Sequence, residues 1–348
     1  MKEDLRFRSF SEWATGGSEL PLLGRETLLW FFIWLFLSAN SLLLAPSVLL
    51  AAGEGVVVRN DQAPLKVDHE VGRFGTGRLY FDDPVDIAVH EDGHVYILDA
   101  GNCRVQVMSE KGRFETQWGE RGEADGYFDE PIALSLNPDG NFLVILDKGT
   151  FRINKYDEDG NYQLSFGEEG SRKGMFDDPV DVTIDSQNYI YVADRGRSRI
   201  LKFHKSGAFI EEWGGRGRPE ERLMEPISVA FTDERTGVIN VLDAGNKNIV
   251  RFGRDGRFID VIEYPTYLLE EGGNPVKIEA GGDKELFVLD AGGGKLLKLR
   301  GYGIWVFQLR SEDVPLRQPG GLAVDEENRI LVTDLGKNRI YRFSMEMD

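Results

Sequence analysis

The chain has 348 residues, and its 59 Asp and Glu against 41 Lys and Arg give a formal net charge of −18 at pH 7. A chain this acidic repels phosphate, and no stretch of five to eight residues is strongly basic, so nucleic acid is excluded as the expected partner. Cys103 is the only cysteine, which excludes a fold held by intramolecular disulfides.

The first candidate element is an apolar segment, 27–53, that follows a charged leader, 1–26. It carries no charge over 27 residues, while a membrane-spanning helix needs about 20 apolar residues. The sequence therefore predicts one N-terminal hydrophobic helix, either a retained transmembrane signal anchor or a signal peptide cleaved within 51–53. The length favours the anchor, whereas Asn40 and Pro46 interrupt the apolar run.

The residues before this segment indicate its orientation. Four basic side chains precede it and favour an N-terminus in the cytoplasm: Lys2, Arg6, Arg8 and Arg25. Export of a chain without disulfides suits a bacterial cell envelope. We therefore expect the remainder of the chain on the extracytoplasmic side, anchored in the inner membrane or secreted.

After an expected linker, 54–65, one sequence motif of alternating residues occurs six times, and its Asp recurs every 44 to 49 residues. The copies begin at Val95, Leu143, Ile190, Ile239, Leu286 and Ile330. This period is that of a four-stranded propeller blade. The sequence predicts an all-β, six-bladed β-propeller of four-stranded antiparallel blades over 66–348.

Turn residues divide each repeat into four short strands, a to d. In the first repeat they are 85–90, 94–98, 104–108 and 113–118. The same layout follows a proline in every later repeat, at Pro131, Pro179, Pro226, Pro275 and Pro319. Strand b is apolar almost throughout, as expected of a strand covered by a neighbouring blade on both faces.

Each strand b ends in Asp, followed by x-Gly and, in five repeats, a basic residue five positions after the Asp. The Asp residues are Asp99, Asp147, Asp194, Asp243, Asp290 and Asp334. We interpret the Asp as a cap for amides of its own turn, the Gly as a supplier of positive φ, and the basic residue as a cover for the adjacent blade or a partner for a carboxylate. These groups build blades and are not a repeated metal site.

The chain ends soon after strand c of the sixth repeat. The missing outer strand is predicted at the other end of the domain, where 66–74 ends in the same Phe-Gly pair that closes other d strands. Pairing of this segment with the C-terminal strands would close the ring and remove its open edges.

The frame of residues 81–108, FDDPVDIAVHEDGHVYILDAGNCRVQVM, resembles the NHL repeat. The resemblance covers 66–343; it is specific in repeats 1, 3 and 6 and degenerate in repeat 5. It implies a six-bladed ring with strand a lining the central channel. It does not imply one activity, because NHL propellers include protein- and RNA-binding modules, extracellular sensor domains and a peptide-amidating lyase.

The resemblance to the amidating lyases implies zinc-binding histidines just after the proline that opens each blade. Here those positions hold Val85, Ile132, Val180, Ile227, Val276 and Gly320, which cannot bind a metal. The four histidines, His69, His90, His94 and His204, do not recur at one blade position. A zinc lyase of this type is therefore not expected. Acidic d-to-a connections likewise disfavour RNA on the same face.

The next position of strand a points toward the top of the channel, and here the repeats differ. Asp86 and Asp181, with Ser228 and Lys277, form a candidate site for Ca²⁺ or another divalent cation, or for an amine-bearing ligand. In the alternative interpretation these side chains only hydrogen-bond neighbouring turns or ordered water. Two basic residues of a b-to-c turn belong to the same candidate ligand site: Arg195 and Arg197.

Together these features predict a monomeric, non-enzymatic propeller. Its expected ligand is a protein, a peptide rich in basic residues, or another component of the cell envelope. Its N-terminal helix is expected to contact the membrane. No resident cofactor is expected apart from the candidate cation. The alternative is a metal-dependent lyase or hydrolase with its carboxylates at the top of the channel.

Overall fold

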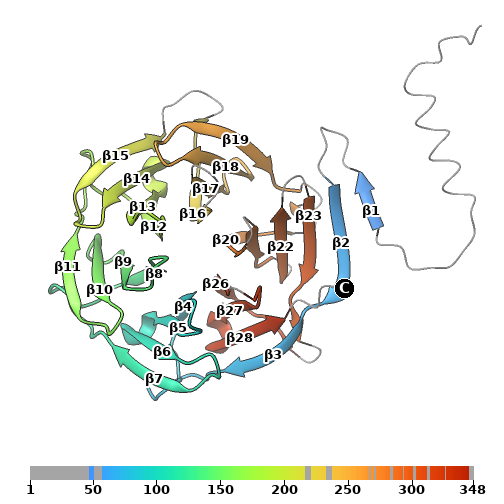
Figure 1. Ribbon diagram of the computed structural model, residues 1–348, viewed down its shortest axis with the longest axis horizontal. Helices are drawn as coiled ribbons and strands as arrows, with labels where there is room; N and C mark the ends of the chain where they lie inside the picture. Colours follow the sequence, from blue (N-terminus) through green and yellow to red (C-terminus); the bar gives the residue numbers. More distant parts are fainter. Residues whose placement is uncertain are drawn as a thin grey trace, which may run out of the picture. The chain divides into compact units, whose positions relative to one another are not determined.

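Mainly antiparallel sheets, each containing strands a to c of one sequence repeat, are arranged in a ring in the computed structural model (Figure 1). The ring belongs to the compact unit Pro46–Asp348. The structure describes residues 47–50, 57–215, 221–232, 237–265, 268–269, 272–282, 285–292, 294–300, 303–311, 314–325 and 327–344. The predicted all-β six-bladed propeller of four-stranded antiparallel blades is confirmed.

The first three blades follow the predicted a-to-d layout. Blade 1 contains β4 (Pro84–Val89), β5 (Val95–Asp99), β6 (Arg104–Met108) and β7 (Phe114–Trp118). Blade 2 contains β8 (Pro131–Leu136), β9 (Phe142–Asp147), β10 (Arg152–Asp157) and β11 (Tyr162–Phe166). Blade 3 contains β12 (Pro179–Ile184), β13 (Tyr189–Asp194), β14 (Arg199–His204) and β15 (Phe209–Gly214). In blades 1 and 3 the b-to-c turns are the 3-10 helices η2 (Ala100–Asn102) and η3 (Arg195–Arg197).

The second half of the ring repeats this order. Blade 4 contains β16 (Pro226–Thr232), β17 (Val238–Asp243), β18 (Asn248–Gly253) and β19 (Phe258–Glu263). Blade 5 contains β20 (Pro275–Ala280), β21 (Leu286–Asp290), β22 (Lys295–Arg300) and β23 (Gly303–Gln308). Blade 6 contains β26 (Pro319–Val324), β27 (Ile330–Asp334), the turn η6 (Leu335–Lys337), β28 (Arg339–Ser344) and, from the other end of the domain, β3 (Lys66–Val71). A short hairpin of β24 (Arg310–Ser311) and β25 (Val314–Pro315) precedes blade 6.

Apolar side chains between blades hold the ring together. Every residue of β5 and of β9 is buried, because each strand b is covered on both faces. Aromatic residues of strand d act as wedges: the ring of Trp118 lies 6.2 Å from that of Tyr96 and 6.2 Å from that of Tyr156 in the next blade. Full burial of one large apolar side chain stabilises a fold by about 1.5–3 kcal/mol, so these contacts favour a closed ring.

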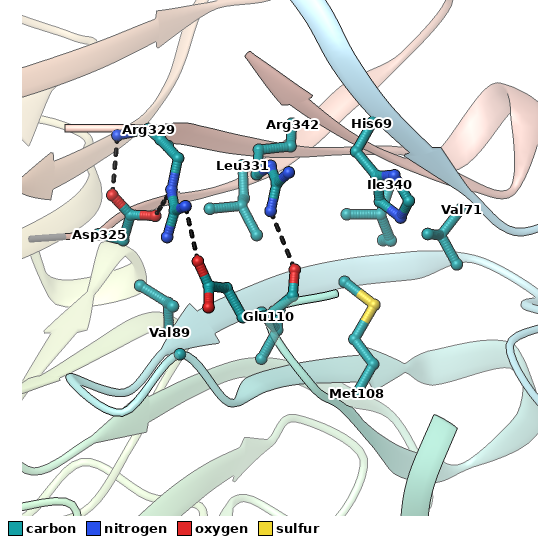
Figure 2. Close-up of a pocket in the computed structure, with 12 residues that line it drawn as sticks. His69, Val71, Val89, Met108, Glu110, Asp325, Arg329, Leu331, Ile340 and Arg342 are labelled. Atoms are coloured by element: carbon teal, nitrogen blue, oxygen red, sulfur yellow. Dashed lines mark hydrogen bonds and ion pairs between the residues drawn. The ribbon is translucent and has the colours of Figure 1, made fainter. Parts of the chain in front are cut away.

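The predicted closure of the ring is also confirmed. Strand β3 pairs antiparallel with β28, with Val71 opposite Ile340 and Lys66 opposite Ser344. Figure 2 shows the adjoining contact between blades 6 and 1, where Arg329 bridges two elements. Its Nη1 lies 2.7 Å from Glu110 Oε1, and its Nε lies 2.6 Å from Asp325 Oδ2.

Residues before β3 add strands that the sequence did not predict. Strand β2 (Val57–Pro64) pairs in parallel with β23, and β1 (Ser47–Leu50) pairs with β2, so the sheet of blade 5 has six strands. Most of the segment expected as a linker, 54–65, therefore joins this sheet. The predicted N-terminal helix, 27–53, lies outside the described residues except at β1, which is a strand and follows the helix-breaking Pro46.

Within the described part of the chain, no helix is long and apolar enough to cross a membrane.

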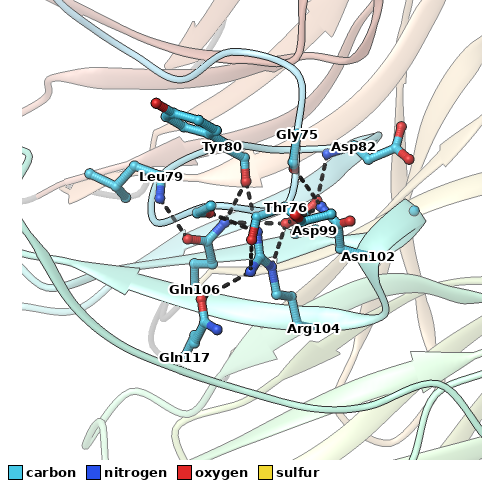
Figure 3. A network of polar contacts seen from close by, with 12 residues as sticks. Gly75, Thr76, Leu79, Tyr80, Asp82, Asp99, Asn102, Arg104, Gln106 and Gln117 are labelled. Carbon is cyan, nitrogen blue, oxygen red and sulfur yellow. Dashed lines mark hydrogen bonds and ion pairs between the residues drawn. The ribbon is translucent and has the colours of Figure 1, made fainter.

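The expected cap is confirmed in blades 2, 4 and 5, where Asp147, Asp243 and Asp290 accept the amides of Thr150, Asn246 and Gly292 of their own turns. The recurring Asp also has a second role that the sequence did not predict. In blade 1 the carboxylate of Asp99 accepts hydrogen bonds from the amide of Asp82 (2.7 Å) and from Arg104 Nε (2.8 Å), so it fastens the d-to-a connection that precedes its blade (Figure 3). The equivalent carboxylates of the other five blades also accept amides of the preceding connection. The predicted pairing of the basic residue with a carboxylate is confirmed for Arg104.

The recurring Gly was misinterpreted. Gly101 does not have positive φ; the residue two positions later, Cys103, has φ 49°. A Cβ atom at position 101 would lie 2.7 Å from the Asp82 carbonyl oxygen, closer than real contacts allow. Glycine is therefore required at this turn because the d-to-a connection passes directly over it.

Candidate functional site

The top of the channel opens into a cavity of about 300 Å³. Its wall includes the first residue after the opening proline of every blade: Val85, Ile132, Val180, Ile227, Val276 and Gly320. Five of these are aliphatic, and we call them the apolar collar. Because strand a alternates, the next residue of each strand points to the interior beneath the collar.

Three of the predicted site residues meet at the floor of this cavity. Lys277 Nζ of β20 lies 3.0 Å from Asp86 Oδ2 of β4 and 2.8 Å from Asp181 Oδ1 of β12. All three side chains are buried. One ammonium group therefore joins blades 1, 3 and 5 across the channel.

Backbone amides and a hydroxyl complete the coordination of both carboxylates. Asp86 Oδ2 also accepts the amide of Leu134 at 2.9 Å, and Asp181 Oδ2 accepts the amide of Val229 at 2.9 Å. Ser228 Oγ donates to Asp181 Oδ2 at 2.5 Å. The four predicted floor residues, Asp86, Asp181, Ser228 and Lys277, are thus brought together as one hydrogen-bonded group.

The two carboxylates favour the charged form of the Lys277 ammonium that lies between them. Burial alone would lower the pKa of Lys277, but Asp181 and Asp86 raise it above its ordinary value. Burial raises the pKa of Asp86, while Lys277 opposes that change. The ammonium of Lys277 thus stands where the sequence placed an external cation or amine, between the two carboxylates.

A second cavity, of about 100 Å³, lies on the other side of Lys277. Glu279 lines it from β20, two residues after Lys277 and on the same side of the strand. The side chain of Glu279 is partly buried, and desolvation raises the pKa of its carboxyl to about 8, with Lys277 opposing the change and Asp86 and Asp181 adding to it. Sequence reasoning missed Glu279, although its i, i+2 spacing from Lys277 is a signal that it faces the channel.

The predicted basic residues lie at the rim rather than on the floor. Arg195 Nε is 2.7 Å from Asp178 Oδ2, and Lys148 Nζ reaches Asp178 Oδ1 at 2.8 Å. Partial burial opposes the change, yet these two cations hold the pKa of Asp178 below its usual range. Arg197 Nε lies 3.8 Å from Asp177 Oδ2.

The rim encloses a further cavity of about 510 Å³ between blades 4 and 5. Arg195 lines it, and it shares Ile227, Asn274 and Val276 with the cavity over the channel. Five acidic side chains of the d-to-a connections are exposed around the same end of the ring, and we call them the acidic rim: Asp83, Asp129, Glu130, Asp177 and Glu225. The arrangement is an apolar opening with an ion-paired floor and a negatively charged edge.

Comparisons with known proteins agree with this architecture. A family model described as NHL repeat matches residues 81–108 and 176–203, which belong to blades 1 and 3. The chain is an NHL-repeat six-bladed β-propeller. The two matched NHL repeats each contain strands a to c of one blade, so the sequence family and the blade coincide.

Two curated proteins are similar to short parts of this NHL propeller. Protein brain tumor of Drosophila melanogaster is 27% identical over 74 residues, which are 21% of this chain and 7% of that protein. Peptidyl-glycine alpha-amidating monooxygenase of Mus musculus is 33% identical over 93 residues, which are 25% of this chain and 10% of that protein. The chain thus spans a tenth or less of the length of these relatives.

Solved structures share the fold of the NHL propeller at low identity. A streptogramin B lyase structure has a TM-score of 0.56 at 15% identity, covering 79% of this chain and 96% of that chain. Hydrazine synthase of Kuenenia stuttgartiensis has a TM-score of 0.53 at 14% identity, covering 75% of this chain and 76% of that chain. At these identities the likeness shows the fold alone.

Proposed function

We propose that this NHL propeller is a binding scaffold whose ligand is a protein or peptide segment, held over the top of the channel. The segment would place an aliphatic side chain inside the apolar collar and basic side chains against the acidic rim. The observation that carries the proposal is the composition of the channel opening: five of its six equivalent positions are aliphatic, and the sixth is Gly320.

Charge supports the choice of a basic partner. The exposed carboxylates of the acidic rim lie within two residues of the prolines that open blades 1 to 4, and the cations Arg195 and Lys148 are already paired with Asp178. Complementary charges at a rim accelerate association and select among partners. The acidic rim therefore attracts a basic peptide segment and repels an acidic one.

The floor geometry favours binding over metal-dependent lysis or hydrolysis. A metal at the top of the channel would need the oxygens of Asp86 and Asp181, and these oxygens already accept Lys277, Ser228 and backbone amides. A cation there would have to displace a buried ammonium that completes the same network.

We also propose that the propeller lies outside the cytoplasm of a bacterial cell, held to the membrane by the apolar segment 27–53. The support is the uncharged length of this segment and the basic residues before it. Mass spectrometry of the mature N-terminus tests the proposal: a retained segment 27–53 in the membrane fraction supports anchoring, and a cytosolic protein contradicts it.

The binding proposal is tested with fluorescent synthetic peptides in which one Leu is flanked by Lys and Arg, and with matched peptides flanked by Glu. The basic peptides should bind and should dissociate as ionic strength rises, because exposed charges are screened. Ile132→Arg, in the apolar collar, should abolish binding.

The matched control is Ile210→Arg, at an exposed position of β15. Melting temperatures of both variants separate loss of binding from loss of fold. Equal binding of the basic peptides by Ile132→Arg and Ile210→Arg would contradict the proposal, as would tighter binding of the acidic peptides.

A further inference from the structure

The turn between β4 and β5, at the end of blade 1 away from the apolar collar, gathers two imidazoles around one carboxylate. His90 Nδ1 and His94 Nδ1 each lie 2.8 Å from Asp92 Oδ1. On its other side, His94 Nε2 lies 2.6 Å from Glu115 Oε2 of β7. The side chains of Asp92, His94 and Glu115 are all partly open to solvent.

The other blades do not need this arrangement to make the turn. At the position of His90 they carry Asn137 in blade 2, Asp185 in blade 3 and Asp325 in blade 6, and each side-chain oxygen accepts an amide of its own turn. In blade 1 that capping task has moved to Asp92 Oδ1, which accepts the amide of His94 at 2.9 Å. His90 is thus free of the structural role that its counterparts have.

His94 also departs from the repeat. The position of His94 is occupied by Phe142, Tyr189 and Arg329 in blades 2, 3 and 6. The position of Glu115 in strand d is occupied by Gln163, Ile210 and Ile259 in blades 2, 3 and 4. In blade 6 the position of Glu115 is also acidic, Asp68, so the departures from the repeat that meet at this turn are the two histidines.

Without a metal ion, the contacts require His94 to be doubly protonated. Both histidines would have to donate from Nδ1 to a single oxygen, and His94 would also donate from Nε2 to Glu115. With a metal ion on the Nδ1 atoms, each imidazole is neutral, and Nε2 of His94 donates to Glu115. A ligating His that donates its second N–H to a carboxylate is the usual arrangement at protein metal sites.

We propose that His90, Asp92 and His94 bind a divalent transition-metal ion, of the Zn²⁺ class, with Glu115 orienting His94. Two imidazoles and one carboxylate match that class rather than Ca²⁺ or Mg²⁺, which prefer all-oxygen ligands. The donor atoms lie within 4.8 Å of one another, and a tetrahedral zinc centre needs about 3.3 Å between donors. Small rotations of the exposed Asp92 and His94 side chains supply that spacing and leave a fourth position for water.

His90 is the fixed member of the site. Its ring packs against Gly140 of blade 2, where a Cβ atom would overlap the imidazole, and its Nε2 is buried. The ring is thereby held with Nδ1 toward Asp92. A ligand held by packing loses less conformational freedom when the ion binds.

The test uses the full chain without an oligohistidine tag, with Zn²⁺ and Co²⁺ as the probes. We expect one equivalent of Zn²⁺, retained against a colorimetric chelator, and a visible Co²⁺ absorption band typical of four-coordinate cobalt that Zn²⁺ abolishes. Glu115→Gln should weaken Zn²⁺ binding by about 10–100-fold.

The decisive variant is His90→Asn combined with His94→Tyr, because blades 2 and 3 carry these residues at the equivalent positions and fold. It should melt like the wild-type protein in the absence of metal and should not bind Zn²⁺. His204→Asn, a lone histidine of blade 3, is the control and should bind normally.

Three results would overturn the proposal: no stoichiometric Zn²⁺ in the wild-type protein, full binding in the double variant, or equal affinity in Glu115→Gln. Binding that is lost instead in Asp86→Asn with Asp181→Asn would assign the ion to the channel. These outcomes are independent of the peptide-binding experiment, which concerns the opposite end of the ring.

Discussion

At the scale of single residues, the charged side chains of the channel floor, which differ from repeat to repeat, stabilise the fold by pairing with one another. Two Asp side chains with no cation would be costly to bury, and Lys277 from a third blade neutralises them at 3.0 and 2.8 Å. The charge that could have bound an external cation is thereby satisfied within the chain. In the function we propose, ligand recognition therefore depends on the apolar collar and the acidic rim.

Lys277→Met should destabilise the propeller by about 3–5 kcal/mol at pH 7, because it leaves two buried carboxylates without their cation. The loss should shrink in acid, where protonation neutralises Asp86, whose pKa is raised by burial. Denaturant titration measures both values. Lys148→Met, which removes a half-exposed ion pair with Asp178, is the control and should cost no more than about 1 kcal/mol; equal losses in the two variants would contradict the buried network.

Glu279→Gln should change how stability depends on pH. The folded protein keeps a proton on Glu279 up to a pKa of about 8, whereas the unfolded chain releases it near 4.5. Unfolding between these values releases a proton, so the free energy of unfolding of the wild-type protein falls as pH rises from about 5 to 8. Relative to the wild-type protein, Glu279→Gln should gain on the order of a few kcal/mol across this range; parallel profiles would contradict the raised pKa.

Much of the floor could be predicted from sequence at this scale. Asp86, Asp181, Ser228 and Lys277 stood out because their counterparts in other repeats are small. Their mutual contacts could not be predicted, since the separations across the ring depend on how far six strands approach the axis. Glu279 was not predicted, although the alternation of side chains along strand a places it on the same side of the strand as Lys277.

At the scale of the element, the b-to-c turn is a joint to the preceding d-to-a connection, in addition to the cap that its Asp places on its own turn in blades 2, 4 and 5. Arg104 donates to Asp99 and, through its two Nη atoms, to the carbonyls of Thr76, Gly77 and Tyr80. The repeat in the sequence showed that the Asp, the Gly and the Arg of this joint are structural residues. It could not indicate their partners, which lie more than 15 residues earlier and come close only after the blade has formed.

Arg104→Lys should therefore destabilise the propeller by about 1.5–3 kcal/mol, since a lysine cannot replace the planar fork that binds one carboxylate and three carbonyls. Arg152→Lys is the matched change at the same position of blade 2, where the guanidinium is half exposed and contacts the exposed Asp125. It should cost less than about 0.5 kcal/mol. Thermal or denaturant unfolding distinguishes them, and equal effects would contradict the joint.

At the scale of the whole molecule, closure by β3 makes the ring depend on both ends of the domain. A chain ending at Arg329 lacks β27 and β28 and should fail to unfold cooperatively, because β3 loses its partner and blade 6 cannot form. Circular dichroism melting tests this. A soluble truncation that melts cooperatively would contradict the closure.

A circular permutant provides the positive control for closure. Lys66 and Ser344 lie opposite each other in the β3–β28 pair, so a short linker can join them while new termini are placed in the c-to-d turn of blade 3. The permutant should melt cooperatively. Failure of both the truncation and the permutant would indicate that chain order, rather than closure, limits folding.

Six blades and their closure could be predicted because the repeat is regular and the sixth copy lacks one strand. The strands β1 and β2 could not, since residues 47–64 carry no trace of the repeat, although β2 pairs with β23 and β1 with β2.

The most direct test of the binding proposal is amide hydrogen exchange, read by mass spectrometry, with and without the basic peptide that binds best. We expect slower exchange in the d-to-a connections before Pro84, Pro131 and Pro179 and in the b-to-c turns η2 and η3, all at the end that carries the acidic rim. Protection confined to the a-to-b and c-to-d turns at the opposite end of the ring would contradict it.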